Sequence, residues 1–305
     1  MSTGPFEPYA ALRPGDPVAV IAPASGFDRP SFEQGLAVLA ARYRPEYDPG
    51  IFTKLRYLAG DDTRRLEELT RALADTRIRG VFCARGGYGA TRLLGGLRGL
   101  APPAAAKPLV GFSDITALHL WLGAHHRVSV HGPVLTQLGR LPPQTHARLF
   151  ALLESPQPAA DLEATETYVP GVAEGRLVGG NLSVLSRMLG TPWMPRLEDT
   201  ILLLEDFGER PYRLDRMWTH LELAGVFARV RGIALGTFTQ CEEKDAPYSS
   251  SDVLRELVRA SGLPCAAGFP IGHGTENQPV ALGVKVRLDA SARRLSFLEA
   301  AARGR

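Results

Sequence analysis

One stretch decides the fold of this chain, and it reads Lys107-Pro108-Leu109-Val110-Gly111-Phe112-Ser113-Asp114-Ile115-Thr116-Ala117-Leu118-His119-Leu120-Trp121-Leu122. Its first half is a short apolar run, which predicts a buried strand. After the Ser-Asp pair, Ile115, Leu118 and Leu122 recur at the spacing of one helix face. The stretch therefore predicts a strand that runs straight into a helix, with the Ser-Asp pair at the junction.

Ser113 has two interpretations at this junction. A serine directly before an apolar helical run is commonly an N-cap, and Asp114 in the first turn would offset the helix dipole. A hydroxyl at the positive end of a helix, beside free N–H groups, also suits a nucleophile with its oxyanion hole. Ile115 stands where a Gly-x-Ser-x-Gly elbow has its second glycine. A nucleophile would need a base, an orienting carboxylate and a further donor elsewhere in the chain.

The composition is that of an ordinary globular protein. The chain has 305 residues, of which 45% are hydrophobic and 22% charged, and this length favours two domains. A formal net charge of +3 is too balanced to favour nucleic acid or an anionic membrane as a partner. The three cysteines, Cys83, Cys241 and Cys265, form no Cys-x-x-Cys pair, so we expect neither a disulfide framework nor a structural zinc site. No cluster of His, Cys and carboxylate residues has metal-ligand spacing, and we expect no metal and no cofactor.

The cellular location is predicted from what the sequence lacks. Residues 1–14 show no basic region followed by an apolar run, which a signal peptide would have. No stretch is apolar over the length needed to cross a bilayer. Because widely spaced cysteines are also typical of a reducing compartment, we expect a cytoplasmic protein.

Apolar runs and amphipathic segments alternate in the first half of the chain. Strands are predicted at 18–22, 79–84, 109–113 and 128–131, with helices between them. Such alternation favours an α/β fold with a doubly wound parallel sheet.

The middle of the chain predicts a domain boundary. Residues 141–170 are rich in proline, alanine, glutamate and threonine, as a connection between domains is. We therefore predict an N-terminal domain over 1–140 and a C-terminal domain over 171–305. The second domain is expected to be richer in strands and glycine turns, with a fully apolar strand that begins at Thr200.

Two histidines are candidates for the general base, and three acids are candidates for the carboxylate that orients it. His273 stands between two glycines, which leave its imidazole accessible as a general base, although it could also be an exposed histidine without a role. His131, at the end of a predicted strand, is the other serious candidate. Glu205 ends an apolar strand, at the edge where α/β proteins place active sites. Asp206 and Glu209 are equally plausible there, and each of the three could be merely solvated.

The segment Arg85-Gly86-Gly87-Tyr88-Gly89 follows a predicted strand and precedes a helix. Its spacing matches neither Gly-x-Gly-x-x-Gly nor a P-loop. Bare backbone N–H groups at such a turn suit an oxyanion or a carboxylate better than a nucleotide. Arg85 could pair with a substrate carboxylate through two hydrogen bonds, or it could be an ordinary surface arginine.

Taken together, these motifs resemble the LD-carboxypeptidase family, which are serine peptidases of the S66 type. Seven segments carry the resemblance, in family order along most of the chain. They are Val-Ala-Val-Ile-Ala-Pro-Ala-Ser-Gly at 18–26, Arg-Gly-Gly-Tyr-Gly at 85–89, Gly-Phe-Ser-Asp-Ile-Thr at 111–116, His-Gly-Pro at 131–133, Gly-Gly-Asn-Leu at 179–182, Leu-Leu-Glu-Asp at 203–206 and Gly-His-Gly at 272–274. The resemblance implies an N-terminal Rossmann-like parallel-sheet domain and a smaller, β-rich α/β C-terminal domain.

The resemblance also implies a Ser-His-Glu triad in the cleft between the two domains. In this arrangement Ser113 attacks the scissile carbonyl, His273 takes and returns the proton, and Glu205 orients His273. The chain order of the three residues is that of the α/β-hydrolases, but the family is a different one, so the likeness is convergent.

The oxyanion hole and the substrate contacts follow from the same resemblance. The oxyanion would rest on the backbone N–H of Asp114 and on one N–H of the glycine loop, with Gly86 favoured over Gly87. Three residues are weaker candidates for holding the free carboxylate of the substrate: Arg85, Asn181 and Arg176.

The implied activity is removal of the terminal D-alanine from murein tetrapeptides during cell-wall recycling in the cytoplasm. We therefore expect a peptide substrate with a C-terminal D-amino acid and, as is common in the family, a homodimer. A relative in the same family confers immunity to peptide-nucleotide antibiotics of the microcin C type, and an aminoacyl-nucleotide hydrolase is the first alternative. A Rossmann-type nucleotide-binding module that uses residues 85–89 is a third hypothesis.

Overall fold

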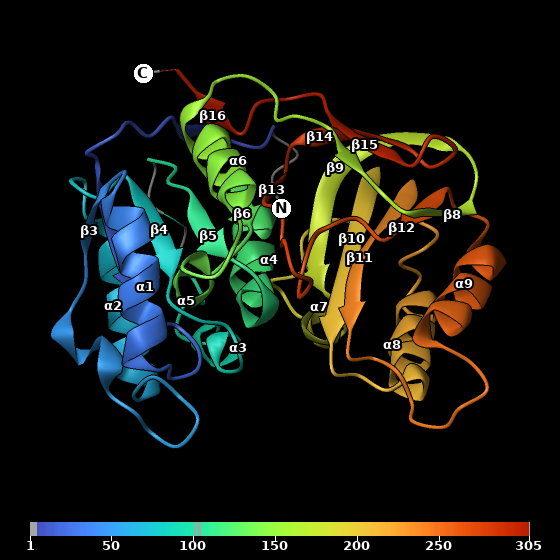
Figure 1. Cartoon of the computed structure of the whole chain (residues 1–305), viewed down its shortest axis with the longest axis horizontal. Coiled ribbons are helices and arrows are strands. Elements are labelled where there is room, and N and C mark those ends of the chain that lie inside the picture. Colours follow the sequence, from blue (N-terminus) through green and yellow to red (C-terminus); the bar gives the residue numbers. More distant parts are fainter. Residues whose placement is uncertain (1–4, 101, 103–104, 305) are drawn as a thin grey trace.

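The computed structural model describes residues 5–100, 102 and 105–304, and two large sheets lie side by side in it (Figure 1). The first sheet has six strands in the order β13-β6-β5-β4-β2-β3. Strands β2 to β6 run parallel, and β13 pairs antiparallel with β6. The strands are β2 (Pro17–Ile21), β3 (Arg44–Glu46), β4 (Gly80–Cys83), β5 (Leu109–Gly111), β6 (Ser129–His131) and β13 (Val280–Leu282).

Helices cover both faces of this first sheet, because successive side chains of a strand enter two different cores. Ala19 and Ile21 of β2 pack with α2, α3 and α4, whereas Val18 and Val20 pack with α1, α5 and α6. This confirms the predicted doubly wound α/β arrangement. The helices are α1 (Arg29–Ala40), α2 (Asp62–Ala74), α3 (Ala90–Leu93), α4 (Thr116–Ala124), α5 (Leu135–Leu138) and α6 (Pro143–Glu154), with one short 3₁₀ turn, η1 (Pro49–Phe52), after β3.

The second sheet has eight strands in the order β7-β15-β14-β9-β10-β11-β12-β8. Strands β9 to β12 run parallel and form its centre, while the outer strands are antiparallel. They are β7 (Leu162–Glu163), β8 (Glu166–Val169), β9 (Val172–Asn181), β10 (Thr200–Phe207), β11 (Gly232–Thr239), β12 (Cys265–Ala267), β14 (Lys285–Asp289) and β15 (Arg294–Phe297).

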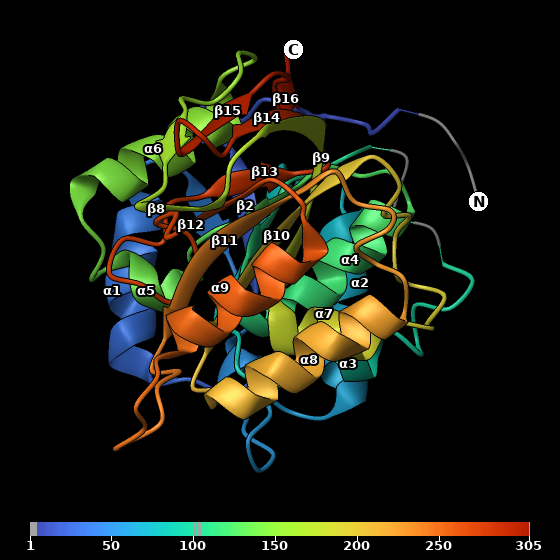
Figure 2. The same cartoon turned by 90° about the vertical axis from the view of Figure 1, so that its right-hand side faces the viewer.

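Three helices pack on one face of the second sheet: α7 (Leu182–Met188), α8 (Pro211–Leu223) and α9 (Ser250–Ser261). Figure 2 shows α8 and α9 in front of β10 and β11. Leu202 and Leu204 of β10 meet Leu214 and Trp218 of α8 in that core. Since α4 contacts both β9 and α7, the helix that follows Ser113 also joins the two sheets.

Two features of the chain path bear on the predicted domain limits. The segment 141–170 holds α6, β7 and β8, and the last two belong to the second sheet. Near the C-terminus, β13 returns to the first sheet, and β16 (Ala302–Arg303) pairs with β1 (Tyr9–Ala10). We keep the limits 1–140 and 171–305 as a proposal, with these crossings added. No helix in the described residues is long and apolar enough to span a membrane.

Candidate active site

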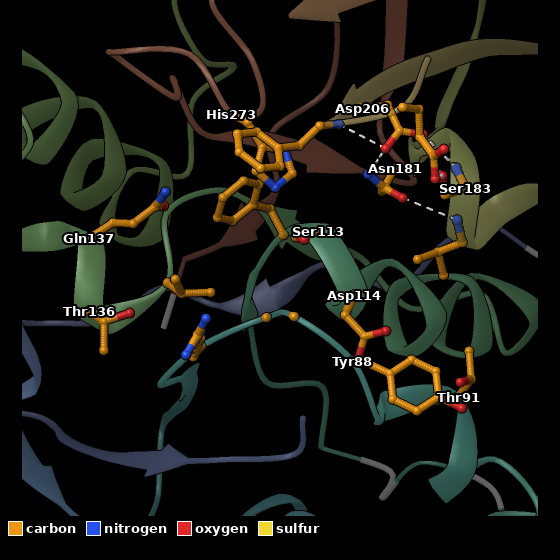
Figure 3. Close-up of a pocket in the computed structure, with 18 of the residues that line it drawn as sticks. Tyr88, Thr91, Ser113, Asp114, Thr136, Gln137, Asn181, Ser183, Asp206 and His273 are labelled. Atoms are coloured by element: carbon orange, nitrogen blue, oxygen red, sulfur yellow. Dashed lines mark hydrogen bonds between the residues drawn. The ribbon is translucent and has the colours of Figure 1, made fainter. Parts of the chain in front are cut away.

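A cavity of about 900 Å³ lies between the two halves of the molecule, at the carboxyl ends of the central parallel strands (Figure 3). Ser113 follows β5, while Asn181 ends β9 and Asp206 lies at the end of β10. All three line the cavity, together with His273 from the loop after β12. Ser113 and His273 are 160 positions apart in the sequence, and the topology brings both of them to this cavity.

Ser113 occupies a strained turn between β5 and the short 3₁₀ turn η2 (Ser113–Ile115), which leads into α4. Its φ is +63°, a left-handed conformation that non-glycine residues adopt rarely and that costs conformational energy. The side chain does not cap the helix, and η2 has no side-chain cap. The interpretation of Ser113 as an N-cap is therefore wrong, and its hydroxyl is left for the cavity.

The imidazole of His273 is held by a buried carboxylate. Its Nδ1 lies 2.6 Å from Oε2 of Glu205, whose side chain has no exposed surface. No hydrogen bond links the other oxygen, Oε1, to any of the described residues. A short contact with a carboxylate favours the tautomer that carries its proton on Nδ1. In that tautomer Nε2 has the free lone pair that a general base needs.

Ser113 and His273 face the same cavity in Figure 3, one from each half of the molecule. Within the described residues no hydrogen bond joins Ser113 Oγ to the His273 ring, whose nearest polar partner is Glu205. Such nucleophile–base bonds are often long until substrate binds.

Two aromatic rings flank His273, and the sequence did not point to them. The centroid of Phe112, the residue before the serine, lies 4.7 Å from that of His273. The centroid of Phe207, directly after Asp206, lies 5.1 Å away on a ring that is tilted by 33°. Both phenylalanines line the cavity, and Phe207 is 45% exposed there. Their position after a strand end was the only available signal.

The side-chain amides of Asn277 and Gln137 hold the loop that carries His273, and the sequence did not point to either of them. Asn277 Oδ1 accepts a hydrogen bond from the backbone N–H of Gly272 at 3.0 Å. Its Nδ2 donates to Oε1 of Gln137 at 3.3 Å, and Gln137 lines the cavity from α5. A buried amide with partners on two segments restrains both of them.

Asp114 is buried behind the serine, and its carboxylate accepts a hydrogen bond from the backbone N–H of Ala90 at 2.7 Å. Burial raises the pKa of this carboxyl above its usual range, while the bond from Ala90 opposes that rise. The Asp114 backbone N–H donates to no described residue, so it is free to meet an oxyanion.

The glycine loop comes very close to Ser113. A Cβ on Gly86 would lie 3.0 Å from Ser113 Cβ and 3.3 Å from its Oγ, so a larger residue would crowd the Ser113 side chain. The loop crosses the cavity wall between β4 and α3, and the N–H groups of Gly86 and Gly87 donate to no described residue. Unpaired backbone donors in a loop beside a hydroxyl suit an oxyanion, as the sequence predicts.

Asp206 is the neighbour of Glu205, but it does not approach His273. Its oxygens accept hydrogen bonds from Asn181 Nδ2 at 2.9 Å, from the N–H and Oγ of Ser183 at 2.8 Å each, and from the Phe207 N–H at 2.8 Å. Burial, and next the charge of Glu205, raise the pKa of Asp206 to about 6. Its role in the structure is to hold the start of α7 against the end of β10.

His131, the other candidate base, is fully buried and does not line the cavity. Neither ring nitrogen has a hydrogen-bond partner among the described residues. Burial lowers the pKa of His131 well below its usual value, and the nearby His119 and His273 lower it further. Because it neither reaches the cavity nor takes up a proton readily, it is the weaker candidate.

The three candidates for substrate binding have different positions. Arg85 lines the cavity and donates one hydrogen bond to the Gly26 carbonyl at 2.6 Å, which leaves further N–H groups available. Asn181 also lines the cavity, but its amide caps α7 and binds Asp206. Arg176 does not line the cavity: it pairs with Glu299 at 2.7 Å, so this candidate is withdrawn.

Comparisons with known proteins agree with this geometry. The sequence matches the family models of the LD-carboxypeptidase N-terminal domain over residues 18–132 and of the C-terminal domain over residues 174–288. The murein tetrapeptide carboxypeptidase of Pseudomonas aeruginosa is 36% identical to it, over 86% of this chain and 89% of that protein. A probable murein peptide carboxypeptidase of Bacillus subtilis is 33% identical, over 95% and 93%.

Solved structures of similar proteins share the fold of this chain. Muramoyltetrapeptide carboxypeptidase from Oxalobacter formigenes superposes with a TM-score of 0.82 at 28% identity, and the match covers 92% of this chain and 97% of that one. MccF in complex with glutamyl sulfamoyl guanosine superposes with a TM-score of 0.87 at 22% identity, over 97% and 99%. The last likeness shows the shared two-domain fold. This chain belongs to the LD-carboxypeptidase family and is a serine-type carboxypeptidase.

Proposed function

We propose that this enzyme removes the C-terminal D-alanine from murein tetrapeptides, with Ser113, His273 and Glu205 as its triad. The observation that carries the proposal is the 2.6 Å contact between His273 Nδ1 and the buried Glu205, in a cavity that Ser113 also lines. Relatives that are 33% and 36% identical over most of the chain bear murein peptide carboxypeptidase names. Membership of a peptidase family also replaces the hypothesis of a nucleotide-binding module.

The first half of the reaction forms an acyl-enzyme. Ser113 Oγ attacks the carbonyl before the terminal D-alanine, and its proton passes to Nε2 of His273. Glu205 then faces an imidazolium, whose charge it stabilises across the 2.6 Å contact. The tetrahedral oxyanion rests on the N–H of Asp114 and on an N–H from the glycine loop, Gly86 or Gly87.

Formation of the acyl-enzyme releases the first product, and its hydrolysis releases the second. The intermediate collapses, the C–N bond breaks, and His273 gives its proton to the leaving amine of D-alanine. A water molecule that His273 deprotonates then attacks the acyl carbon, and Ser113 leaves with a proton from His273. No step in this sequence needs a cofactor.

The charges of the cavity suit a peptide with a free carboxylate. Arg85, Arg140 and Arg187 line it, and among the described residues no Asp or Glu side chain forms a hydrogen bond or ion pair with any of the three. A guanidinium binds a carboxylate through two parallel hydrogen bonds. We assign the terminal carboxylate of the substrate to Arg85, because this residue adjoins the glycine loop beside Ser113.

Location and assembly belong to the same proposal. We propose that the enzyme acts on recycled murein peptides in the cytoplasm and that it assembles as a homodimer. Size-exclusion chromatography with light scattering tests the dimer, since a monomer at micromolar concentration would contradict it.

The test of function is release of D-alanine from a purified murein tetrapeptide. The wild-type enzyme is expected to release it, and Ser113→Ala to lose at least about 10⁴-fold in kcat/KM with an unchanged fold. An aminoacyl-sulfamoyl adenosine, assayed in parallel, tests the alternative activity. Cleavage of that compound alone would refute the murein proposal and favour an immunity-type hydrolase.

A further inference from the structure

We propose that Ser25 is a positioning residue of this reaction, because its hydroxyl and backbone hold the glycine loop so that the Gly87 N–H faces the oxyanion. This inference rests on the proposed function, in which the glycine loop supplies one oxyanion donor. Ser25 lies in the loop that follows β2 and is buried against residues 86–88. It does not line the cavity, so it acts through the loop and not on the substrate.

Three hydrogen bonds connect Ser25 to the glycine loop. Its backbone N–H donates to the Gly86 carbonyl at 3.1 Å. Its Oγ accepts from the Tyr88 N–H at 3.0 Å and lies 3.3 Å from the Tyr88 carbonyl, to which it donates. A single serine thus fixes the peptide groups on both sides of Gly87.

The direction of the Gly87 N–H follows from the geometry of the peptide bond. In a trans peptide the C=O of one residue and the N–H of the next point in opposite directions. Since the Gly86 carbonyl points to Ser25, the Gly87 N–H points away from Ser25. That N–H has no partner among the described residues, and the Gly86 Cα beside it faces Ser113. The structure therefore favours Gly87 over Gly86 as the oxyanion donor, contrary to the expectation from the resemblance.

The loop also packs so closely against Ser25 that a side chain at position 87 would not fit. Gly87 has a φ of +95°, and a Cβ there would lie 2.5 Å from Ser25 Oγ. Ser25 is itself anchored by the turn at residues 55–59, because Ala59 N–H donates to the Ala24 carbonyl at 3.0 Å and Gly26 N–H donates to the Tyr57 carbonyl at 3.2 Å. The positioning contact thus comes from a fixed support.

Only a short hydroxyl side chain can make both contacts with Tyr88, since it must accept from one group and donate to the other. In Ser25→Ala the Tyr88 N–H and C=O both lose their partner, whereas the bond from the backbone N–H of residue 25 to the Gly86 carbonyl remains. The Gly87 donor is then held from one side only, because the peptide between Gly87 and Tyr88 can rotate. One oxyanion donor contributes about 10²–10³-fold to kcat, so a misoriented donor should cost about 10- to 100-fold.

The variant Ser25→Ala is compared with Ser261→Ala as a matched control. Ser261 Oγ likewise donates to one carbonyl, of Val258 at 2.7 Å, and accepts from one backbone N–H, of Leu263 at 3.3 Å, but it lies at the end of α9 outside the cavity. We expect Ser25→Ala to lower kcat about 10- to 100-fold with KM changed less than about threefold. Ser261→Ala should keep the wild-type kcat.

A second measurement separates positioning from a structural defect. A peptidyl boronic acid, which forms a tetrahedral adduct with a serine nucleophile, should bind Ser25→Ala more weakly by the same factor as the loss of kcat. The product tripeptide, whose carboxylate is planar and forms no tetrahedral oxyanion, should bind nearly as it does to the wild type. If Ser25→Ala does not fold, Ser25→Cys replaces it, because a thiol keeps the volume but donates and accepts only weakly.

Two results would overturn the inference: a kcat within twofold of the Ser261→Ala control, or equal losses of affinity for the boronic acid and the product. Failure of the proposed function would look different. In that case the wild type itself would release no D-alanine. The role of Ser25 is tested separately, by the affinity of Ser25→Ala for the boronic acid relative to that of the wild type.

Discussion

The carboxylate of Asp114 accepts a hydrogen bond from the backbone N–H of Ala90 at 2.7 Å. It thereby ties the residue after the nucleophile to the end of the glycine loop. The two backbone donors of the proposed oxyanion hole come from strand ends that are neighbours in the first sheet, since β4 pairs with β5. The contact between Asp114 and Ala90 thereby fixes the spacing between these two backbone donors.

Asp114→Ala is therefore expected to affect both catalysis and stability. The change leaves the buried N–H of Ala90 without a partner, which costs about 1–3 kcal/mol of the free energy of unfolding. It also loosens the glycine loop, so we expect kcat to fall about 10-fold or more. Denaturant titration and tetrapeptide kinetics measure the two effects.

Asp61→Ala provides the comparison for this prediction. Asp61 caps α2 through the N–H of Arg64 at 2.8 Å and does not line the cavity. Its loss should cost about 1 kcal/mol in stability and leave kcat unchanged. Equal kinetic effects of the two variants would mean that Asp114 has no special relation to the site.

Glu205→Gln tests the role of the buried carboxylate. Glutamine has nearly the same shape, but it carries no charge to stabilise the imidazolium and can select the wrong histidine tautomer. We expect kcat to fall about 10³- to 10⁴-fold with little change in KM. Glu154→Gln is a suitable control, because Glu154 binds Tyr43 outside the cavity. A Glu205→Gln enzyme with a tenth of the wild-type kcat would exclude Glu205 as the orienting group.

The choice between Glu205 and Asp206 illustrates what the sequence could predict. It placed acids at the carboxyl end of an apolar strand, and this is where β10 ends. Successive residues of a strand point to opposite faces, so only one of the two can face His273. Which one does so depends on the loop of His273, whose position is set by Asn277 and Gln137 from distant parts of the chain. Local patterns do not contain that information.

The histidines show the same limit. His131 and His273 both have a glycine neighbour, and the sequence offered each as the base. In the structure the His131 ring is buried near Phe112 and His119, at centroid distances of 6.0 and 6.2 Å, and β13 pairs with the edge of β6. A long-range strand pairing of this kind is invisible in a short window. The proposed nucleophile was easier to find, because the strand-to-helix junction at Ser113 is a local feature.

The raised pKa of Asp206 predicts that the free energy of unfolding depends on pH. Its pKa is raised from 3.8 to about 6, so the folded protein favours the protonated form more than the unfolded chain does. The stabilising contribution is complete below pH 3.8 and is lost as the pH rises through about 6. The difference between the two pKa values corresponds to at most about 3 kcal/mol.

Asp206→Asn removes this titration. The variant should be less stable than the wild type at pH 5, because it loses acceptors for the Ser183 groups. The gap between the two proteins should narrow between pH 5 and pH 8, since only the wild type has a carboxyl to ionise there. Thermal unfolding at the two pH values measures this, and a gap that widens would contradict the raised pKa.

Arg85 and Arg176 provide a pair of arginines that the sequence did not separate. Arg85 lines the cavity, whereas Arg176 pairs with Glu299 and with the carbonyl of Gly283. We expect Arg85→Gln to raise KM for the tetrapeptide about 10-fold through loss of a charge-assisted hydrogen bond, with kcat nearly unchanged. Arg176→Gln should leave both constants unchanged. The reverse result would move the carboxylate site away from the glycine loop.

Phe207 is expected to act on catalysis through the orientation of His273. Its ring lies 5.1 Å from the imidazole, and Phe112 contacts the same imidazole at 4.7 Å, so the two rings restrict its rotation about χ2. Phe207→Ala removes one of the two restraints, and the base then spends less time in line with Ser113. We expect kcat to fall about 10-fold, while Phe207→Tyr, which keeps the ring, should retain most of it. Because Phe207 is 45% exposed, the midpoint of thermal unfolding should change little.

Tyr248→Ala is the control for loss of a similarly exposed ring outside the cavity, and it should leave kcat unchanged. A Phe207→Ala enzyme with wild-type kcat would show that Phe207 does not orient the histidine.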